Sequence, residues 1–231
     1  MRFWFSVALF AAVACAQDAN STFTPGLTGG LTKSEYEKNP SGWDSLIPAN
    51  GDFKNWTRGL QSGSTALTVQ SPWYVDPDTK HLICMGDKAE HEWLRYDREY
   101  KNFVFHVEWR FFPVAANPRY NSGVFVRNNA TGTVWHQAQI GQDGGYIFAM
   151  TPVNGTPKRI DLKSERTENR IRPVGDWNTY EITAKADRLT LWVNGAVTSV
   201  MNGLEVLQGF VGLEAEGYKI EFRNVRIKEL P

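Results

Sequence analysis

Apolar and polar residues alternate along much of the chain with the two-residue period of strands that bury one face. Residues 103–111 place Phe103, Phe105, Val107, Trp109 and Phe111 on one face and His106, Glu108 and Arg110 on the other. Residues 209–216 place Val211, Leu213 and Ala215 on one face and Glu214 and Glu216 on the other. Each segment predicts a strand with an apolar core face and a polar outer face.

The segment 120–140 predicts two neighbouring strands with unusual outer faces. Val124 and Val126 are the inward positions of the first strand, and Ala138 and Ile140 are those of the second. The outward set is then Phe125, Arg127, Trp135, Gln137 and Gln139. Because adjacent strands lie about 5 Å apart, we expect this set to share one concave surface. His136 falls on the inward side, which favours a packed histidine over a catalytic base.

Two local signals fix turns and irregularities. Asn194-Gly195 lies between two alternating runs and predicts a type I′ hairpin, in which both turn residues have positive φ. In residues 219–230 the apolar positions change from even, at Ile220 and Phe222, to odd further on. One extra residue would restore a single buried face, so we predict a β-bulge near Arg223-Asn224.

The pattern as a whole predicts an all-β fold. Strands dominate, turns are rich in Gly, Pro and Asn, and one short helix is expected within residues 33–38. An antiparallel two-sheet β-sandwich or jelly roll follows. The domains expected are a signal peptide over 1–16, a polar leader or linker over 17–42, and the jelly roll over 43–231.

The amino terminus predicts export. A single early Arg2 precedes a short apolar run that ends in small residues, with Ala14 and Ala16 in an A-x-A arrangement. We expect cleavage after Ala16 and a periplasmic or secreted protein; lipidation at Cys15 is a weaker alternative. The run is too short to span a membrane. Cleavage would leave Cys84 as the sole cysteine, which excludes an intrachain disulfide.

The amino-acid composition limits the classes of molecule that the protein is expected to bind. The formal net charge of the 231 residues is zero, so nothing favours nucleic acid or an anionic membrane. Aromatic residues make up 13%, including nine tryptophans, which suits either a large sandwich core or sugar-stacking platforms. No cofactor is indicated. Asp76 and Asp78 offer ligands to a divalent cation such as calcium, although Asp-Pro-Asp is also ordinary turn chemistry.

The outward set on 120–140 could bind a sugar. Amides pair with vicinal hydroxyl groups, tryptophan stacks on a sugar ring, and arginine polarises a carbonyl group. An ordinary solvated sheet face is an equally good interpretation of that set. Glu108 and Glu214 are the candidate carboxylates, with exposed ion pairing or edge-strand charge as the alternative for each.

Six short motifs resemble one known family in their order and spacing. They are NSGVFVR, HQAQI, GDWNTYEI, WVNG, GFVGLEAEG and IEFRNVRIKEL. The chain resembles the 3-keto-disaccharide hydrolase domain, also called the 3-keto-glucoside lyase/hydratase domain, over roughly residues 43–230. The resemblance implies a concanavalin A-like jelly roll that acts on glycosides oxidised to a ketone at C3. The family commonly has Glu-x-Gln where this chain has Gln137-Ala138-Gln139, and an amide cannot serve as a general base.

The resemblance implies a mechanism with named candidates. A C3 ketone acidifies the C2 proton, a base removes it, a donor stabilises the enolate, and the C1–O bond breaks before water adds. Glu108 or Glu214 would be the base, Arg127 the donor, and Trp135, Gln137 and Gln139 the substrate-binding residues. The competing functions are a non-catalytic carbohydrate-binding module on the same fold and a structural or surface-interaction domain.

Overall fold

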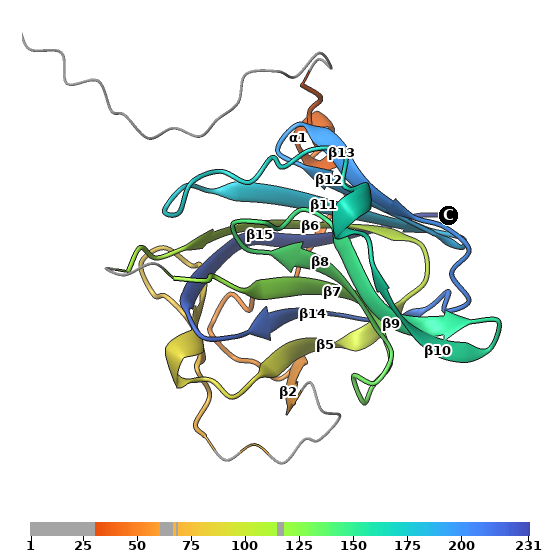
Figure 1. Ribbon diagram of the computed structural model, residues 1–231. Helices are drawn as coiled ribbons and strands as arrows, with labels where there is room; N and C mark the ends of the chain where they lie inside the picture. Colours follow the sequence, from red (N-terminus) through yellow and green to blue (C-terminus); the bar gives the residue numbers. More distant parts are fainter. Residues whose placement is uncertain (1–30, 61–66, 68, 115–117) are drawn as a thin grey trace, which may run out of the picture.

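The computed structural model describes residues 31–60, 67, 69–114 and 118–231. These residues form two antiparallel sheets packed face to face, as Figure 1 shows. The predicted signal peptide and the first part of the predicted linker lie outside the described residues. Among the described residues, no helix has the length and hydropathy needed to cross a bilayer.

Sheet A has eight strands in the order β13-β12-β11-β6-β15-β4-β3, with β1 paired to β15. Its strands are β1 (Asp44–Ser45), β3 (Trp73–Val75), β4 (Leu82–Met85), β6 (Phe103–Phe111), β11 (Asn178–Lys185), β12 (Arg188–Val193), β13 (Ala196–Met201) and β15 (Lys219–Glu229). Its centre is β6, whose alternate residues enter the core as the sequence predicts.

Sheet B has seven strands in the order β10-β9-β8-β7-β14-β5-β2. Its strands are β2 (Trp56–Leu60), β5 (Glu92–Tyr100), β7 (Ser122–Asn128), β8 (Trp135–Ile140), β9 (Ile147–Val153), β10 (Thr156–Asp161) and β14 (Gly209–Ala215). Two 3-10 turns, η1 (Gly86–Lys88) and η2 (Lys163–Glu165), lie in the connections. The pairing is antiparallel throughout, so the predicted two-sheet sandwich is confirmed.

The core lies between the two sheets. Val124, Ala138 and Leu213 project inward from sheet B, and Trp109 and Tyr180 project inward from sheet A. The indole of Trp109 and the phenol of Tyr180 meet edge to face, with ring centroids 5.5 Å apart. This apolar interior is the main stabilising element, because roughly 25 cal/mol is gained for each Å² of apolar surface removed from water.

The predicted turn and bulge are both confirmed. Asn194 has φ 44° and Gly195 has φ 114°, as a hairpin turn with positive φ at both positions requires. In β15 the register against β6 shifts between Arg223 and Arg226, and Asn224 has φ 47°. The bulge lets Phe222 and Val225 both enter the core despite their odd spacing.

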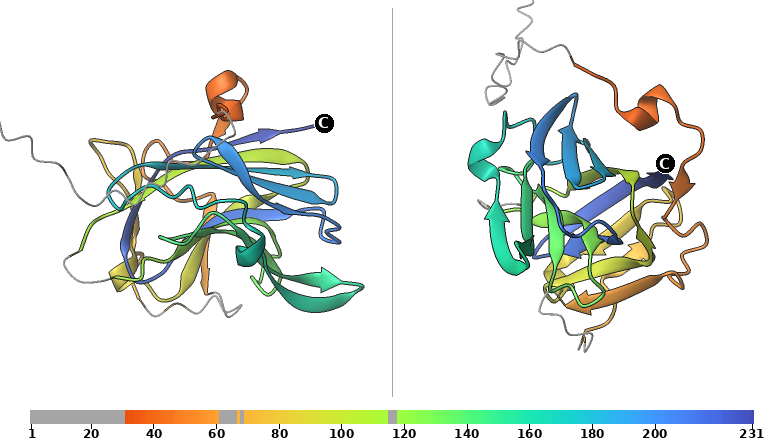
Figure 2. Two further views of the ribbon diagram at one scale, coloured as in Figure 1. Left: turned by 45° about the horizontal axis from the view of Figure 1, so that its top comes forward. Right: turned by 90° about the vertical axis from the view of Figure 1, so that its right-hand side faces the viewer.

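Residues 31–42 of the predicted linker are part of the folded structure. The short helix α1 (Glu35–Lys38) begins with a capping box between Ser34 and Glu37. The carboxylate of Glu181 on β11 accepts hydrogen bonds from the backbone N–H groups of Glu35 (2.6 Å) and Tyr36 (2.9 Å). These hydrogen bonds attach helix α1 to the outer face of sheet A. Figure 2 shows the helix outside the two packed sheets.

Candidate functional site on the outer face of sheet B

A row of aromatic rings crosses the outer face of sheet B. Ring centroids lie 5.8 Å apart for Trp93 and Phe125, 6.4 Å for Phe125 and Trp135, and 4.9 Å for Trp135 and Phe148. These residues come from β5, β7, β8 and β9, so the row runs across the strands. Trp93 and Phe125 are buried, whereas Trp135 and Phe148 are partly exposed. The exposed end of the row offers apolar ring surface of the kind that sugars stack on.

A glycine lets the aromatic row cross β14, which lies between β5 and β7. A Cβ atom on Gly212 would lie 2.7 Å from Cε3 of Trp93. Glycine has no side chain, so the indole can lie over β14 and reach Phe125. The glycine in the motif GFVGLEAEG therefore has a packing role beneath the site.

A chain of polar side chains runs parallel to the aromatic row. Nε2 of Gln137 donates to Oε2 of Glu214 at 2.8 Å, and Nε2 of His91 lies 2.8 Å from Oε1 of Glu214. Gln137 and Glu214 come from β8 and β14, with β7 between them. A Cβ atom on Gly123 of β7 would lie 2.1 Å from the Gln137 amide nitrogen. A second glycine thus lets the amide reach the carboxylate across a strand.

Three further polar groups extend this chain. Gln139 donates to Oδ1 of Asn121 at 2.5 Å, and Asn121 donates to the carboxylate of Glu216. Gln137 also donates to Oε1 of Gln139 at 3.3 Å. The outer face therefore combines ring surface with hydrogen-bonding groups, as expected of a surface that binds polyhydroxylated ligands.

Glu214 and His91 differ sharply in exposure although they share a hydrogen bond. The Glu214 side chain is 5% exposed and the His91 side chain is 55% exposed. Burial raises the pKa of the Glu214 carboxyl, even though the hydrogen bond from His91 acts in the other direction. The hydrogen bond to Glu214 raises the pKa of His91, against the effect of partial burial. Nδ1 of His91 has no partner among the described residues, so His91 is the accessible end of the pair.

His91 is the functional candidate that sequence reasoning missed. It lies one residue before β5 and shares the parity of Trp93 and Arg95, which face outward. That parity was readable from the sequence. Its proximity to Glu214 was not, because the pairing of β5 with β14 joins residues more than a hundred positions apart.

Three groups at this site could hold a metal ion. One donor atom each of His91, Glu214 and Glu216 lies within 4.8 Å of the others. The pair of cation ligands predicted from the sequence, Asp76 and Asp78, is not part of this group. The Asp76 carboxylate accepts hydrogen bonds from the backbone N–H groups of Asp78 (3.1 Å) and Thr79 (2.8 Å), which is the turn alternative. Dependence on a divalent cation such as calcium stays a prediction.

The structure brings together five of the residues expected on this face. Phe125, Trp135, Gln137 and Glu214 lie on the outer side of sheet B, with Gln139 beside them. His136 is fully buried on the inner side, where Nε2 lies 2.9 Å from Oγ1 of Thr151. Burial lowers the pKa of His136 to about 4, so the ring is neutral at pH 7. The structure thus confirms that His136 packs inward.

The predicted placement of Arg127 is wrong. Its side chain is fully buried and donates to the carbonyl groups of Lys101 (2.6 Å) and Ala186 (2.7 Å), in two turns at the end of the sandwich. The cause is a bulge: β7 and β14 lose register beside this residue, and Arg127 has φ 51°. The bulge reverses the direction that alternation assigns to the side chain. A donor placed there does not reach a ligand on the outer face.

Glu108 also lies away from this site, on the outer face of sheet A. Its carboxylate accepts from Nε of Arg223 and from Nδ2 of Asn224, both at 2.6 Å. Burial alone would raise the pKa of Glu108, but hydrogen bonds from His106, Asn224 and Arg223 lower it to about 2. Glu108 and Glu214 are therefore not brought together, and Glu108 is a poor base.

Comparisons with known proteins agree with this architecture. Residues 42–228 match the family described as the 3-keto-alpha-glucoside-1,2-lyase-like domain. A search of curated proteins found no match.

Three solved structures share the fold. The first is a protein of Parabacteroides distasonis named as a candidate glycosyl hydrolase, with 18% identity, a TM-score of 0.58 and coverage of 88% of this chain and 100% of that chain. A second candidate glycosyl hydrolase from that organism has 17% identity, a TM-score of 0.55 and coverage of 81% and 99%. The carbohydrate-binding module CBM66 of Bacillus subtilis has 13% identity, a TM-score of 0.55 and coverage of 76% and 96%.

Proposed function

Because the chain belongs to the 3-keto-alpha-glucoside-1,2-lyase-like family, we propose that it is an enzyme that cleaves 3-keto-glycosides on the outer face of sheet B. The observation that carries this proposal is the hydrogen-bonded chain from Gln137 through Glu214 to the exposed His91, beside the aromatic row. It supplies a proton-accepting group, a buried carboxylate that orients it, and a stacking surface.

Substrate binding uses the partly exposed end of the aromatic row. The sugar ring stacks on Trp135, and the partly exposed Gln139 faces its hydroxyl groups. Gln137 is only 5% exposed and donates to Gln139 and Glu214, so it positions these two side chains. Stacking on the indole fixes the plane of the sugar ring, and hydrogen bonds to the polar side chains select its orientation. Binding of the leaving sugar extends toward Phe148 on β9.

His91 is the base in this proposal. Glu214 holds the Nε2–H of the imidazole, so that Nδ1 carries the free lone pair. Nδ1 takes the C2 proton, which the C3 ketone acidifies, and the electron pair moves into the enolate. The enolate then expels the C1 oxygen, which takes the proton back from His91. Water adds at C1 of the unsaturated product and a proton returns to C2, so the overall reaction is hydrolysis.

The Glu-to-Gln departure at position 137 is compatible with catalysis in this arrangement. Gln137 is not the base; its N–H group donates to the Glu214 carboxylate. The carboxylate that the chemistry needs is present on β14 rather than on β8. Arg127 has no role in this scheme because it is buried at the end of the sandwich.

Assay of the full chain against a 3-keto-glucoside and its unoxidised parent tests the proposal. We expect turnover of the keto-sugar only, and a loss of about 10²–10⁴-fold in kcat for Glu214→Gln. Glu165→Gln is the matched control, because Glu165 is an exposed carboxylate of η2. Turnover of the unoxidised parent at an equal rate would contradict the assignment.

A second candidate function is a carbohydrate-binding module without catalysis. It is favoured by the fold shared with CBM66 and by the amide at position 137. Calorimetry with the same two sugars separates the candidates. Binding of the keto-sugar by the wild type without release of any product supports the binding module and rules out the enzyme.

We also propose that the protein acts outside the cytoplasm, on the strength of the predicted signal peptide. Amino-terminal sequencing of protein from the native host tests this. A first residue at or near Gln17 is expected; a chain that retains Met1 in the cytoplasm would contradict export, and a lipid on Cys15 would identify a lipoprotein.

A further inference from the structure

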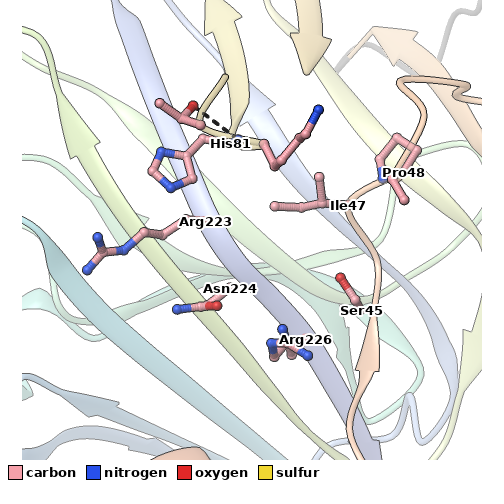
Figure 3. Close-up of a pocket in the computed structure, with 10 residues that line it drawn as sticks. Ser45, Ile47, Pro48, His81, Arg223, Asn224 and Arg226 are labelled. Atoms are coloured by element: carbon pink, nitrogen blue, oxygen red, sulfur yellow. Dashed lines mark hydrogen bonds between the residues drawn. The ribbon is translucent and has the colours of Figure 1, made fainter. Parts of the chain in front are cut away.

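A cavity lies on the opposite side of the molecule from the candidate site, against the outer face of sheet A. Its volume is about 520 Å³, which is within the range of small-molecule sites. One wall is the bulged part of β15, with Arg223, Asn224 and Arg226, and the facing wall is the segment that follows β1, with Ile47 and Pro48 (Figure 3). The residues of the proposed active site take no part in it.

The charges that line this cavity are all of one sign. Its ionisable lining residues are Lys80, His81, Arg223 and Arg226, and no aspartate or glutamate is among the lining residues. Two of these are already paired: His81 with Glu221 at 2.7 Å, and Arg223 with Glu108 at 2.6 Å. Lys80 and Arg226 have no carboxylate partner among the described residues. The cavity therefore carries about two uncompensated positive charges.

Arg226 is the most informative of these residues. Its side chain is partly buried, and its Nε is buried without an acceptor among the described residues. Its guanidinium group stacks on the ring of Tyr36, with 5.1 Å between Cζ and the ring centroid. A buried N–H group without an acceptor is costly. An oxyanion bound at its terminal nitrogens would supply the countercharge that the guanidinium group lacks.

The bulge in β15 creates this arrangement. On a regular strand Arg223 and Arg226, three positions apart, would face opposite sides of the sheet. The register shift between them and the positive φ of Asn224 place both arginines on the wall of the cavity. The sequence feature that restores the core parity of Val225 and Ile227 therefore also gathers cations on the outer face.

We propose that this cavity binds a small organic anion, whose carboxylate or phosphate group is held by Arg226 and Lys80 and whose body packs against Ile47 and Pro48. Arg223 and His81 are already paired with Glu108 and Glu221, so the proposed contacts to the anion do not include them. The apolar wall distinguishes the expected ligand from a bare inorganic ion.

Calorimetry on the full chain at low salt tests the proposal with four probes: glucuronate, glucose 6-phosphate, glucose and inorganic phosphate. We expect the two anionic sugars to bind, glucose not to bind, and inorganic phosphate to bind more weakly than glucose 6-phosphate. Whichever anionic sugar binds more tightly identifies carboxylate or phosphate as the preferred group. Raising the salt concentration should weaken binding, because the attraction is electrostatic.

Substitutions locate the binding. Arg226→Met should weaken it about tenfold or more, as expected for a charge-assisted hydrogen bond. Lys80→Met should weaken it about threefold, because Lys80 is exposed and water screens its attraction for the anion. Arg188→Met, which changes an exposed arginine of β12, and Glu214→Gln should both leave binding unchanged.

Several results would overturn the proposal. They are unchanged affinity in both Arg226→Met and Lys80→Met, equal binding of glucose, and equal affinity for inorganic phosphate and glucose 6-phosphate. Loss of binding in Glu214→Gln would place the anion on sheet B and would also refute it. Failure of the proposed enzymatic activity has no bearing on this result.

Discussion

The outer faces of the two sheets use similar residue types for different purposes. Each face has a glutamate near a histidine: Glu214 with His91 on sheet B, and Glu108 with His106 on sheet A. On sheet A the carboxylate is also held by an arginine, and its pKa is lowered to about 2. On sheet B its other partner is the neutral amide of Gln137, and burial raises its pKa.

The histidines show the same contrast. His106 is 1% exposed and lies between Glu181 (2.9 Å) and Glu108 (3.5 Å). Burial alone would lower its pKa, but the hydrogen bonds to the two carboxylates raise it. His91 has one ring nitrogen on Glu214 and an exposed ring. Partners on both sides make His106 a structural residue, whereas a partner on one side leaves His91 able to exchange a proton with a ligand.

The largest effect that separates the two faces is expected in catalysis. His91→Gln should lower kcat for a 3-keto-glycoside by about 10²–10⁴-fold, because it removes the proton acceptor. His106→Gln is the matched substitution on sheet A and should leave kcat of the folded protein unchanged. Steady-state kinetics with circular dichroism on both variants measures this. If both variants are folded and lose kcat equally, His91 and His106 do not differ in function and the prediction is wrong.

The next largest effect concerns Arg127, which belongs to neither face. Arg127→Met should lower the free energy of unfolding by about 1.5–3 kcal/mol, because the buried guanidinium group that hydrogen bonds to the turn carbonyl groups of Lys101 and Ala186 is lost. Urea denaturation measures the change. Turnover by the folded fraction should equal that of the wild type. If Arg127→Met is as stable as the wild type but inactive, Arg127 takes part in catalysis and this prediction is wrong.

The ion pair between Glu108 and Arg223 on sheet A should make the free energy of unfolding depend on pH. The pKa of Glu108 is about 2 in the folded protein, below its unfolded value of 4.5. Its contribution is therefore present above pH 4.5 and lost as pH falls toward 2. After allowance for solvent screening, because the partner Arg223 is 36% exposed, it amounts to about 1–2 kcal/mol. Thermal melts from pH 7 to pH 2.5 should show that wild type and Glu108→Gln converge on acidification.

A control for this acid effect lies on sheet B. Glu214→Gln should not reproduce the convergence, because no arginine hydrogen bonds to Glu214 among the described residues. A difference between wild type and Glu108→Gln that is constant with pH would mean that the Glu108–Arg223 pair contributes through packing rather than charge.

The smallest effect is expected in stacking. Trp135→Ala should weaken binding of the keto-sugar by about 1 kcal/mol, or roughly fivefold, because one ring face is lost while the polar chain remains. Trp177→Ala is the comparison on sheet A, where Trp177 lies against the guanidinium groups of Arg110 and Arg223. It should leave sugar affinity unchanged. Titration calorimetry distinguishes the two, and equal losses would remove Trp135 from the site.

Local sequence determined the sandwich and much of its detail. The alternation in β6 and β14 predicts which residues enter the core, and the structure confirms it. The Asn194-Gly195 turn and the bulge at Arg223-Asn224 were also readable from the sequence. Each of these follows from backbone periodicity or from the φ preference of one or two residues, which act over a few positions of chain.

The sites were decided by tertiary structure. Alternation could not show that a bulge beside Arg127 turns its side chain inward, because that bulge depends on the pairing of β7 with β14. Nor could it show that Glu108 faces Arg223 while Glu214 faces His91. Those partners come from strands far apart in the sequence, and burial together with the partners determines the pKa of a carboxyl group. Residue type and alternation therefore predict which residues are candidates. The order of the strands determines which partners they meet, and so what chemistry they can perform.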